Sequence, residues 1–229
     1  MTETVPVPRD AVLAAVRAAL ADVSDVASAD TRPPPASAAT PSDRAALLAD
    51  FAREARAVGT VVHVVATVAD AGAAVATIFA DARVARAVAW PTPLARAVAV
   101  SAADGSRDGL DVRFAGTDAD AAAIAHADAG ITEADALVAA SGTLLLRAAS
   151  GARTVSLLPP LHVAVVPAAR VVADLGAALP ASRGRDGAPD TCVTLVTGPS
   201  RTADIEKKLV VGVHGPCALH VIVVEEADC

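Results

Sequence analysis

The amino-acid sequence predicts an α/β fold, with a mixed, mostly parallel β-sheet flanked by helices and a β-hairpin insert. Between residues 60 and 129, short apolar runs alternate with segments of helical periodicity, the pattern of strands joined by helical crossovers. After Gly130 the pattern changes to short apolar runs separated by Ser-Gly and Pro-Pro turns, which is typical of hairpins. The sequence therefore predicts one main sheet and one hairpin insert.

The first 42 residues are predicted to lie outside this sheet. Apolar residues recur at helical spacing over residues 9–23, so we assign an amphipathic helix to segment 1–23. Segment 24–42 is rich in Pro, Ala and Ser, which favours an exposed linker. The α/β domain is expected over residues 43–229, and the linker would let the first helix dock on a partner subunit.

The elements of the domain are expected in the following order. Ser42 is a suitable N-cap for a helix over 43–58 that ends at Gly59. The alternating part is expected to hold strands at 60–67, 86–90 and 111–114 and helices at 70–83, behind Pro93 and at 118–129. The remainder is expected to hold strands at 136–140, 143–148, 154–158 and 162–166, a helix at 171–179 and two terminal strands, the second at 218–224.

Composition excludes several classes of function. The chain has 229 residues, a formal net charge of −7 and 2% aromatic residues, so it offers neither a basic stripe nor stacking platforms for nucleic acid. Its apolar runs are shorter than the roughly 18 residues of a membrane span. Residues 1–10 show no basic region followed by an apolar core, so we expect a cytoplasmic protein without a secretion signal.

The cysteines argue against a metal centre in this chain. Cys192, Cys217 and Cys229 lack the close Cys-x-x-Cys spacing of zinc and iron–sulfur ligands. We expect no cofactor and no metal site in this chain.

The polar stretch at residues 198–206, which follows an apolar run, is the strongest candidate for chemistry. Its small residues leave backbone amides accessible, two hydroxyls add donors, and a guanidinium adds a planar cation, a set that suits a carboxylate or a phosphate. Two acids in the same stretch are candidates for binding a cation or acting as a general base. The alternative is a capped helix start, although capping does not require an arginine. The anion-binding candidates are Gly198, Ser200, Arg201 and Thr202, and the acids are Asp204 and Glu206.

Two further motifs are candidates for the same site. His214, before Gly215 and Pro216, is expected at a strand end, where an imidazole can donate to a substrate oxygen or transfer a proton. The turn Ser141-Gly142-Thr143 supplies backbone and hydroxyl donors for an anion pocket, the alternative being an ordinary hairpin. Ser141 has no neighbouring signature of a hydrolase triad.

Taken in order, five motifs of this chain closely resemble the lactate utilization protein C family, which consists of a LUD domain. The resemblance covers roughly residues 43–226. The motifs are Gly130-Ile131-Thr132 with Ala134-Asp135-Ala136, Ser141-Gly142-Thr143, Ser156 to Pro160, Gly198 to Glu206, and Gly212 to Pro216.

The resemblance implies a NagB/RpiA/CoA-transferase-like fold and a role in cytoplasmic oxidation of L-lactate to pyruvate, beside iron–sulfur partner proteins. This chain departs from the family pattern at one position, because similar members carry an acidic residue where it has Ala140. In related CoA transferases a glutamate from a comparable region is the covalent nucleophile, so the resemblance argues against acyl-glutamyl chemistry here. Catalysis, if this chain performs any, is then expected from Arg201, Asp204, Glu206 and His214.

Three functional hypotheses follow from the sequence. The first is a cluster-free accessory subunit of a lactate-oxidising system that binds a small carboxylate or phosphate anion. The second is a stand-alone sugar-phosphate isomerase or CoA-transferase-like enzyme, although fold is a poor guide to reaction. The third is an assembly factor without a ligand.

Overall fold

The computed structural model describes residues 9–20, 41–106, 109–116, 121–183, 190–203, 209–212 and 214–227, and the chain divides into two units, 1–34 and 35–229. The first unit contains helix α1 (Arg9–Leu20), which lies within the predicted helical segment. Its apolar side chains Val12 and Val16 are 48% and 50% exposed. Residues 21–40, most of the predicted linker, lie outside the described ranges.

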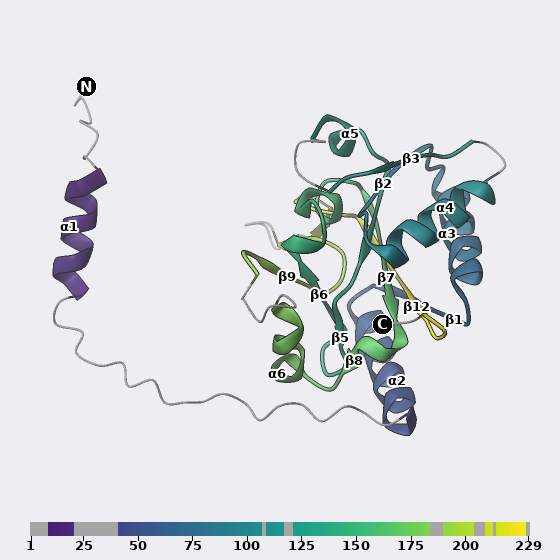
Figure 1. Cartoon of the computed structure of the whole chain (residues 1–229), viewed down its shortest axis with the longest axis horizontal. Helices are drawn as coiled ribbons and strands as arrows, with labels where there is room; N and C mark the ends of the chain where they lie inside the picture. Colours follow the sequence, from purple (N-terminus) through teal and green to yellow (C-terminus); the bar gives the residue numbers. More distant parts are fainter. Residues whose placement is uncertain are drawn as a thin grey trace. The chain divides into compact units, whose positions relative to one another are not determined.

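A six-stranded sheet forms the centre of the second unit (Figure 1). Every paired strand in it runs parallel to its neighbours, which confirms the predicted α/β class with a mainly parallel sheet. In spatial order the strands are β1 (Val61–Val65), β12 (Ala218–Val224), β7 (Leu161–Pro167), β4 (Ala129–Glu133), β2 (Arg86–Ala89) and β3 (Asp111–Phe114).

Helices cover this sheet because its central strands are apolar on both faces. All seven residues of β7 are buried, as expected for a parallel strand between two layers. Helices α3 (Val68–Ala82) and α4 (Pro93–Asp104) pack against each other and against the sheet. A reciprocal capping box of Thr67 and Asp70 fixes the start of α3.

Helix α2 (Pro41–Ala57) packs against β1 and also against β8 (Val171–Val172), which belongs to a second sheet. This four-stranded sheet has the order β8, β5 (Ala136–Val138), β6 (Thr143–Arg147) and β9 (Val193–Val196). Strands β5 and β6 pair antiparallel and form the predicted hairpin insert.

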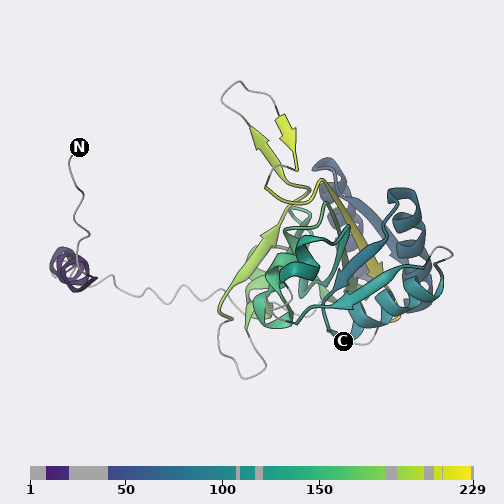
Figure 2. The same cartoon turned by 90° about the horizontal axis from the view of Figure 1, so that it is seen from above.

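A separate hairpin of β10 (Arg201–Ala203) and β11 (Leu209–Val211) projects from the body of the domain (Figure 2). It begins five residues after the end of β9 and ends shortly before β12, so it connects the second sheet to the central one. The alternative of a capped helix start at Ser200 or Thr202 is therefore wrong for residues 201–203, because these residues pair as a strand.

Four predicted elements differ from the structure. The helix expected at 118–129 is only α5 (Ala121–Ala125), since residues 129–133 form β4 between β2 and β7. The strand expected at 154–158 is the 3₁₀ helix η3 (Arg153–Ser156), which packs against β4. The strand expected in the insert at 162–166 is β7 of the parallel sheet. The helix expected at 171–179 is β8 followed by α6 (Leu175–Ala178), because Val171 and Val172 pair with β5.

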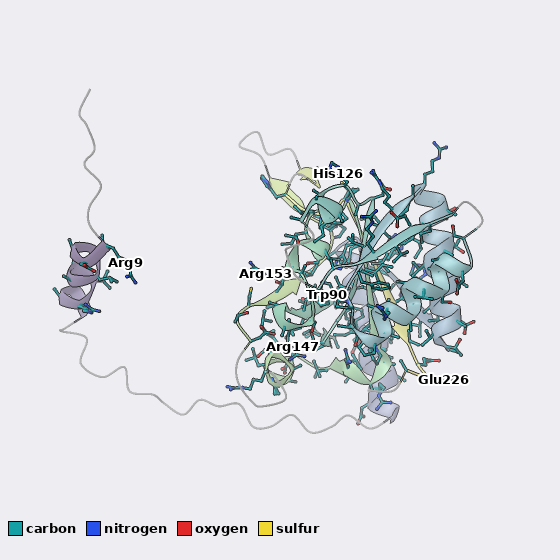
Figure 3. The ribbon with its side chains drawn as sticks, turned by 45° about the horizontal axis from the view of Figure 1, so that its top comes forward. Arg9, Trp90, His126, Arg147, Arg153 and Glu226 are labelled. Atoms are coloured by element: carbon teal, nitrogen blue, oxygen red, sulfur yellow. The ribbon has the colours of Figure 1, made fainter. Side chains whose placement is uncertain are left out.

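The buried Trp90 joins the end of β2 to the segment between β6 and η3 (Figure 3). Its ring is 1% exposed, and its Nε1 donates a hydrogen bond of 2.8 Å to the carbonyl oxygen of Ala152. Because an indole N–H must be satisfied when it is buried, this bond holds that segment against the sheet.

Candidate functional site

The two polar motifs near the end of the chain meet around Ser200. The amide of Ser200 donates to the carbonyl of Pro216 at 2.9 Å, and the amide of Gly212 donates to the carbonyl of Ser200 at 2.9 Å. The loop after β9 is thereby tied to the segment that precedes β12. Residues that lie 12 and 16 positions apart in the sequence thus form one wall.

A cavity of about 330 Å³ lies beside this wall. Residues of β9 line one side of it, and His162 of β7 with Leu219 of β12 line another, so the cavity lies between the two sheets. Its full lining is Ser156, Leu157, His162, Thr194 to Arg201, His214 to Pro216, and Leu219. A volume of this size is at the lower end of the range for small-molecule sites.

The structure brings four of the predicted site residues together in this cavity. Gly198, Ser200, Arg201 and His214 all contribute to its lining. Thr202 follows on β10, where its backbone pairs with Val210. Asp204 and Glu206 lie outside the described residues.

The cavity differs in position from the sequence expectation. Ligands of open α/β sheets usually bind beyond the carboxyl ends of the strands, and His214 was expected at such a strand end. In the structure His214 lies between the end of hairpin strand β11 and the start of β12, and Gly198 follows β9 of the second sheet. The cavity therefore lies near the amino ends of β7 and β12.

Arg201 is anchored to the end of helix α2. Its Nη2 donates to the carbonyl oxygen of Val58, one of the last carbonyls of that helix region. Gly198 has a φ of +84°, and a Cβ at this position would lie 2.7 Å from the same carbonyl oxygen. Close approach of the loop to α2 therefore requires glycine here. A guanidinium has five N–H groups, so the bond to Val58 leaves it further donor capacity.

The turn Ser141-Gly142-Thr143 connects to the cavity through hydroxyl groups. Ser141 Oγ lies 2.7 Å from Thr143 Oγ1, which lies 2.8 Å from Thr197 Oγ1. Thr197 lines the cavity, whereas the turn itself does not. The turn thus supports the cavity wall from behind. Ala140 precedes the turn and is exposed.

Sequence reasoning did not single out His162, whose partner Thr132 belongs to the Gly130-Ile131-Thr132 motif. Nε2 of His162 lies 2.8 Å from Thr132 Oγ1, and the histidine is 1% exposed although it lines the cavity. Burial lowers the pKa of His162 to about 4, so the ring is neutral at pH 7. Finding this pair from sequence requires the pairing of β4 with β7, which places His162 opposite Gly130.

Glu133, at the end of β4, is another buried polar group that the sequence did not single out. Its Oε2 accepts hydrogen bonds from the amides of Leu94 and Ala95, at 3.0 and 3.4 Å, in the first turn of α4. Its Oε1 forms an ion pair of 2.9 Å with Arg170. The side chain of Thr92, the N-cap residue, makes no capping bond because Glu133 takes those amides.

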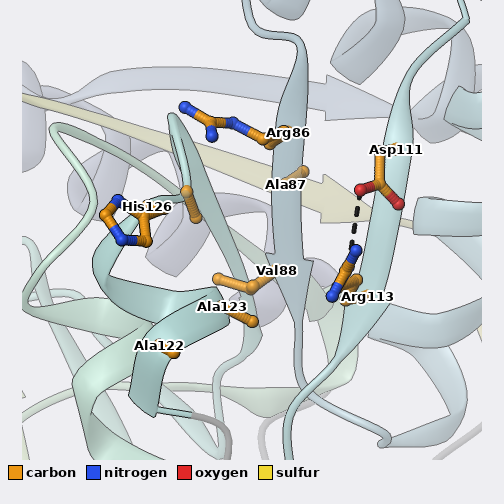
Figure 4. A pocket seen from close by; sticks show the side chains of 9 residues that line it. Arg86, Ala87, Val88, Asp111, Arg113, Ala122, Ala123 and His126 are labelled. Carbon is orange, nitrogen blue, oxygen red and sulfur yellow. Dashed lines mark hydrogen bonds and ion pairs between the residues drawn. The ribbon is translucent and has the colours of Figure 1, made fainter.

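Two other cavities lie at the amino ends of strands. One, of about 270 Å³, contains Arg86, Arg113 and His126 (Figure 4), but Arg113 lies 3.4 Å from Asp111 and Arg86 lies 3.8 Å from Asp128. Its arginines are thus already paired with carboxylates, which makes it a weaker candidate for an anion.

The larger cavity, of about 770 Å³, is lined by His63 and His220, whose Nε2 and Nδ1 lie 3.2 Å apart. Burial lowers the pKa of both rings, with a smaller effect of Arg56 on His63 and of His63 on His220. Apolar residues such as Ile78 and Leu161 line this cavity together with the charged residues Asp81, Arg83 and Asp128.

Among the residues that the structure describes, no group of three or more His, Cys, Asp or Glu side chains is arranged to hold a metal ion. None of the described helices combines the length and apolarity needed to cross a bilayer.

Comparison with known families decides the affiliation of the chain. The family model of the LUD domain matches residues 48–224. The chain belongs to the LUD domain family. The predicted family resemblance is therefore confirmed, and the match contains every predicted site residue.

This LUD domain is similar to curated proteins named lactate utilization protein C. It is 45% identical over 106 residues to the protein of Macrococcus caseolyticus, a match covering 44% of this chain and 46% of the relative. It is 43% identical over 103 residues to the protein of Shouchella clausii, covering 44% and 45%. The matched region thus spans less than half of either relative.

A solved structure supports the fold of this LUD domain. A DUF162 family protein from Deinococcus radiodurans is 28% identical, with a TM-score of 0.56. The match covers 79% of this chain and 98% of the solved chain. The fold described above is therefore found in an experimental structure.

Proposed function

We propose that this LUD domain protein is a cluster-free subunit of a cytoplasmic system that oxidises L-lactate to pyruvate, acting beside iron–sulfur partner proteins. The names of its relatives support the pathway. In this proposal the iron–sulfur clusters of the partners carry the electrons, and the LUD domain binds the small carboxylate.

The cavity between the two sheets is the observation that carries the binding part of this proposal. Arg201, Ser200 and His214 all line this one small cavity, and their side chains carry a cation, a hydroxyl and an imidazole. Charge-assisted hydrogen bonds from a guanidinium are the usual means of holding a carboxylate. Phosphate offers similar acceptors, and the same cavity would bind it by the same groups.

Replacement of Arg201 tests the binding site. We expect Arg201→Ala to weaken binding of L-lactate or pyruvate by about 1.5 to 3 kcal/mol, roughly 10- to 150-fold in Kd, because one charge-assisted contact is lost. Isothermal titration calorimetry of the full chain measures this, and thermal unfolding shows whether the variant remains folded. Arg113→Ala is the matched control, since Arg113 is an exposed arginine at the other small cavity. If both variants bound lactate as well as the parent, the assigned cavity would be wrong.

The pathway is tested separately in cells. An anaerobic extract of a strain that lacks this chain is expected to have lost L-lactate-dependent dye reduction and to regain it when the purified protein is added. Intact activity in the deletion extract, with no change on addition, would exclude the lactate system. The isomerase or CoA-transferase alternative would then be the next reaction to assay.

A further inference from the structure

The cavity contains a second polar group that the binding of a simple carboxylate does not require. His162 is almost fully buried, and its ring nitrogen Nε2 is held by Thr132. Leu219, its register partner on β12, lines the same cavity, so the two side chains occupy one face of the central sheet. Ser200 and His214 lie on loops and Arg201 lies on the hairpin, whereas Thr194 lies on β9 and Ser156 on η3.

We propose that His162 contacts the oxygen on the second carbon of the bound acid, so that the cavity selects 2-hydroxy and 2-oxo acids over plain carboxylates. This inference rests on the proposed function, since it names the substrate class of the same site. Arg201 would bind the carboxylate and His162 the neighbouring oxygen.

The chemistry of a neutral imidazole suits this role. A neutral ring has one donor and one acceptor nitrogen. Thr132 occupies Nε2, which leaves Nδ1 as the nitrogen able to bond a ligand. Because the ring stays uncharged at neutral pH, it adds a hydrogen bond without attracting anions in general, and charge recognition is left to Arg201.

Thr132 is a positioning residue in this proposal. The hydroxyl of Thr132 fixes the orientation of the His162 ring. Whether this hydroxyl donates to Nε2 or accepts from it determines the tautomer of the ring, and so whether Nδ1 is a donor or an acceptor for the ligand. A site built to bond a hydroxyl or carbonyl rejects the analogue that lacks it, because the buried polar group is then left without a partner.

The experiment compares L-lactate, pyruvate and propionate, which share a carboxylate on a short chain but differ at the second carbon. We expect the parent protein to bind L-lactate or pyruvate roughly tenfold more tightly than propionate, measured by calorimetry at pH 7.5. Thr132→Val should reduce this preference by weakening the binding of L-lactate and pyruvate more than that of propionate. Arg201→Ala, in contrast, should weaken all three acids.

A nitrogen-15 NMR measurement on the parent protein avoids dependence on variants. The imidazole of His162 is expected to show the signals of one fixed neutral tautomer, and Nδ1 should shift with L-lactate or pyruvate but not with propionate. Equal affinity for all three acids with an unmoved Nδ1 signal would overturn the role of His162 and leave the carboxylate site intact. Absence of binding by all three acids would overturn both proposals.

Discussion

Gly142→Ala is expected to destabilise the domain by about 3 kcal/mol or more, the largest effect that we predict for a single substitution. Gly142 has a φ of +62°, in the left-handed region that costs other residues about 1 to 2 kcal/mol. A Cβ there would lie 2.3 Å from the amide nitrogen of Ala55 and 2.5 Å from its Cα. Both atoms belong to the backbone of α2, so neither can move aside alone, and overpacking adds about 1 to 3 kcal/mol. Urea unfolding followed by circular dichroism measures the loss.

Gly109→Ala separates the two causes of this effect. Gly109 has a similar φ of +74°, but a Cβ there would have no neighbour within 4 Å. Its substitution should therefore cost only the backbone part, about 1 to 2 kcal/mol. If the two variants lost equal stability, the contact between the turn and α2 would contribute nothing.

The second large effect is a loss of stability in mild acid. The pKa of His162 is about 4 in the folded chain and about 6.5 in the unfolded chain, so the unfolded state binds more protons between these values. Above pH 6.5 His162 is neutral in both states and does not reduce the free energy of unfolding. As the pH falls from 6.5 towards 4, protonation of His162 in the unfolded state lowers that free energy. Between pH 7.5 and 5 the free energy of unfolding should fall by about 2 kcal/mol from this residue.

His162→Gln tests the source of that loss, because glutamine retains hydrogen-bonding capacity and does not titrate. The variant should show a flatter dependence of unfolding free energy on pH, with a residual slope from His63 and His220, whose pKa values are also lowered by burial. An unchanged slope in His162→Gln would assign the acid sensitivity to other groups.

The fold class could be predicted because the alternation of strands and helices is visible in short stretches of neighbouring residues. The alternation of apolar runs and helical segments over residues 60–114 corresponds to β1, α3, β2, α4 and β3, with small shifts at the ends. Strand β4 was missed because Ala129–Glu133 is short and follows an alanine-rich helix without a turn signal. Strand β7 was placed in the hairpin insert, since its partners β4 and β12 lie about 30 and 57 residues away and no local pattern indicates them.

The candidate site was predictable to the extent that its residues occur in compact motifs. The stretch around Ser200 and the His214 turn were singled out by their polar residues, and the structure joins them in one cavity. Their position near the amino ends of β7 and β12 was not predictable, because it depends on how the second sheet packs on the first. His162 was missed for a related reason, since a histidine within an apolar strand has the same pattern whether it faces a cavity or the core.

The bond between Glu133 and helix α4 has a consequence for where an external anion can bind. The first turn of a helix after a parallel strand is a common place for phosphates and carboxylates in α/β proteins. In this chain the carboxylate of Glu133 already occupies the amides of Leu94 and Ala95 and is neutralised by Arg170. The protein thus supplies its own anion at the start of α4. An external anion could bind there only by displacing the carboxylate of Glu133, which the chain itself holds in place.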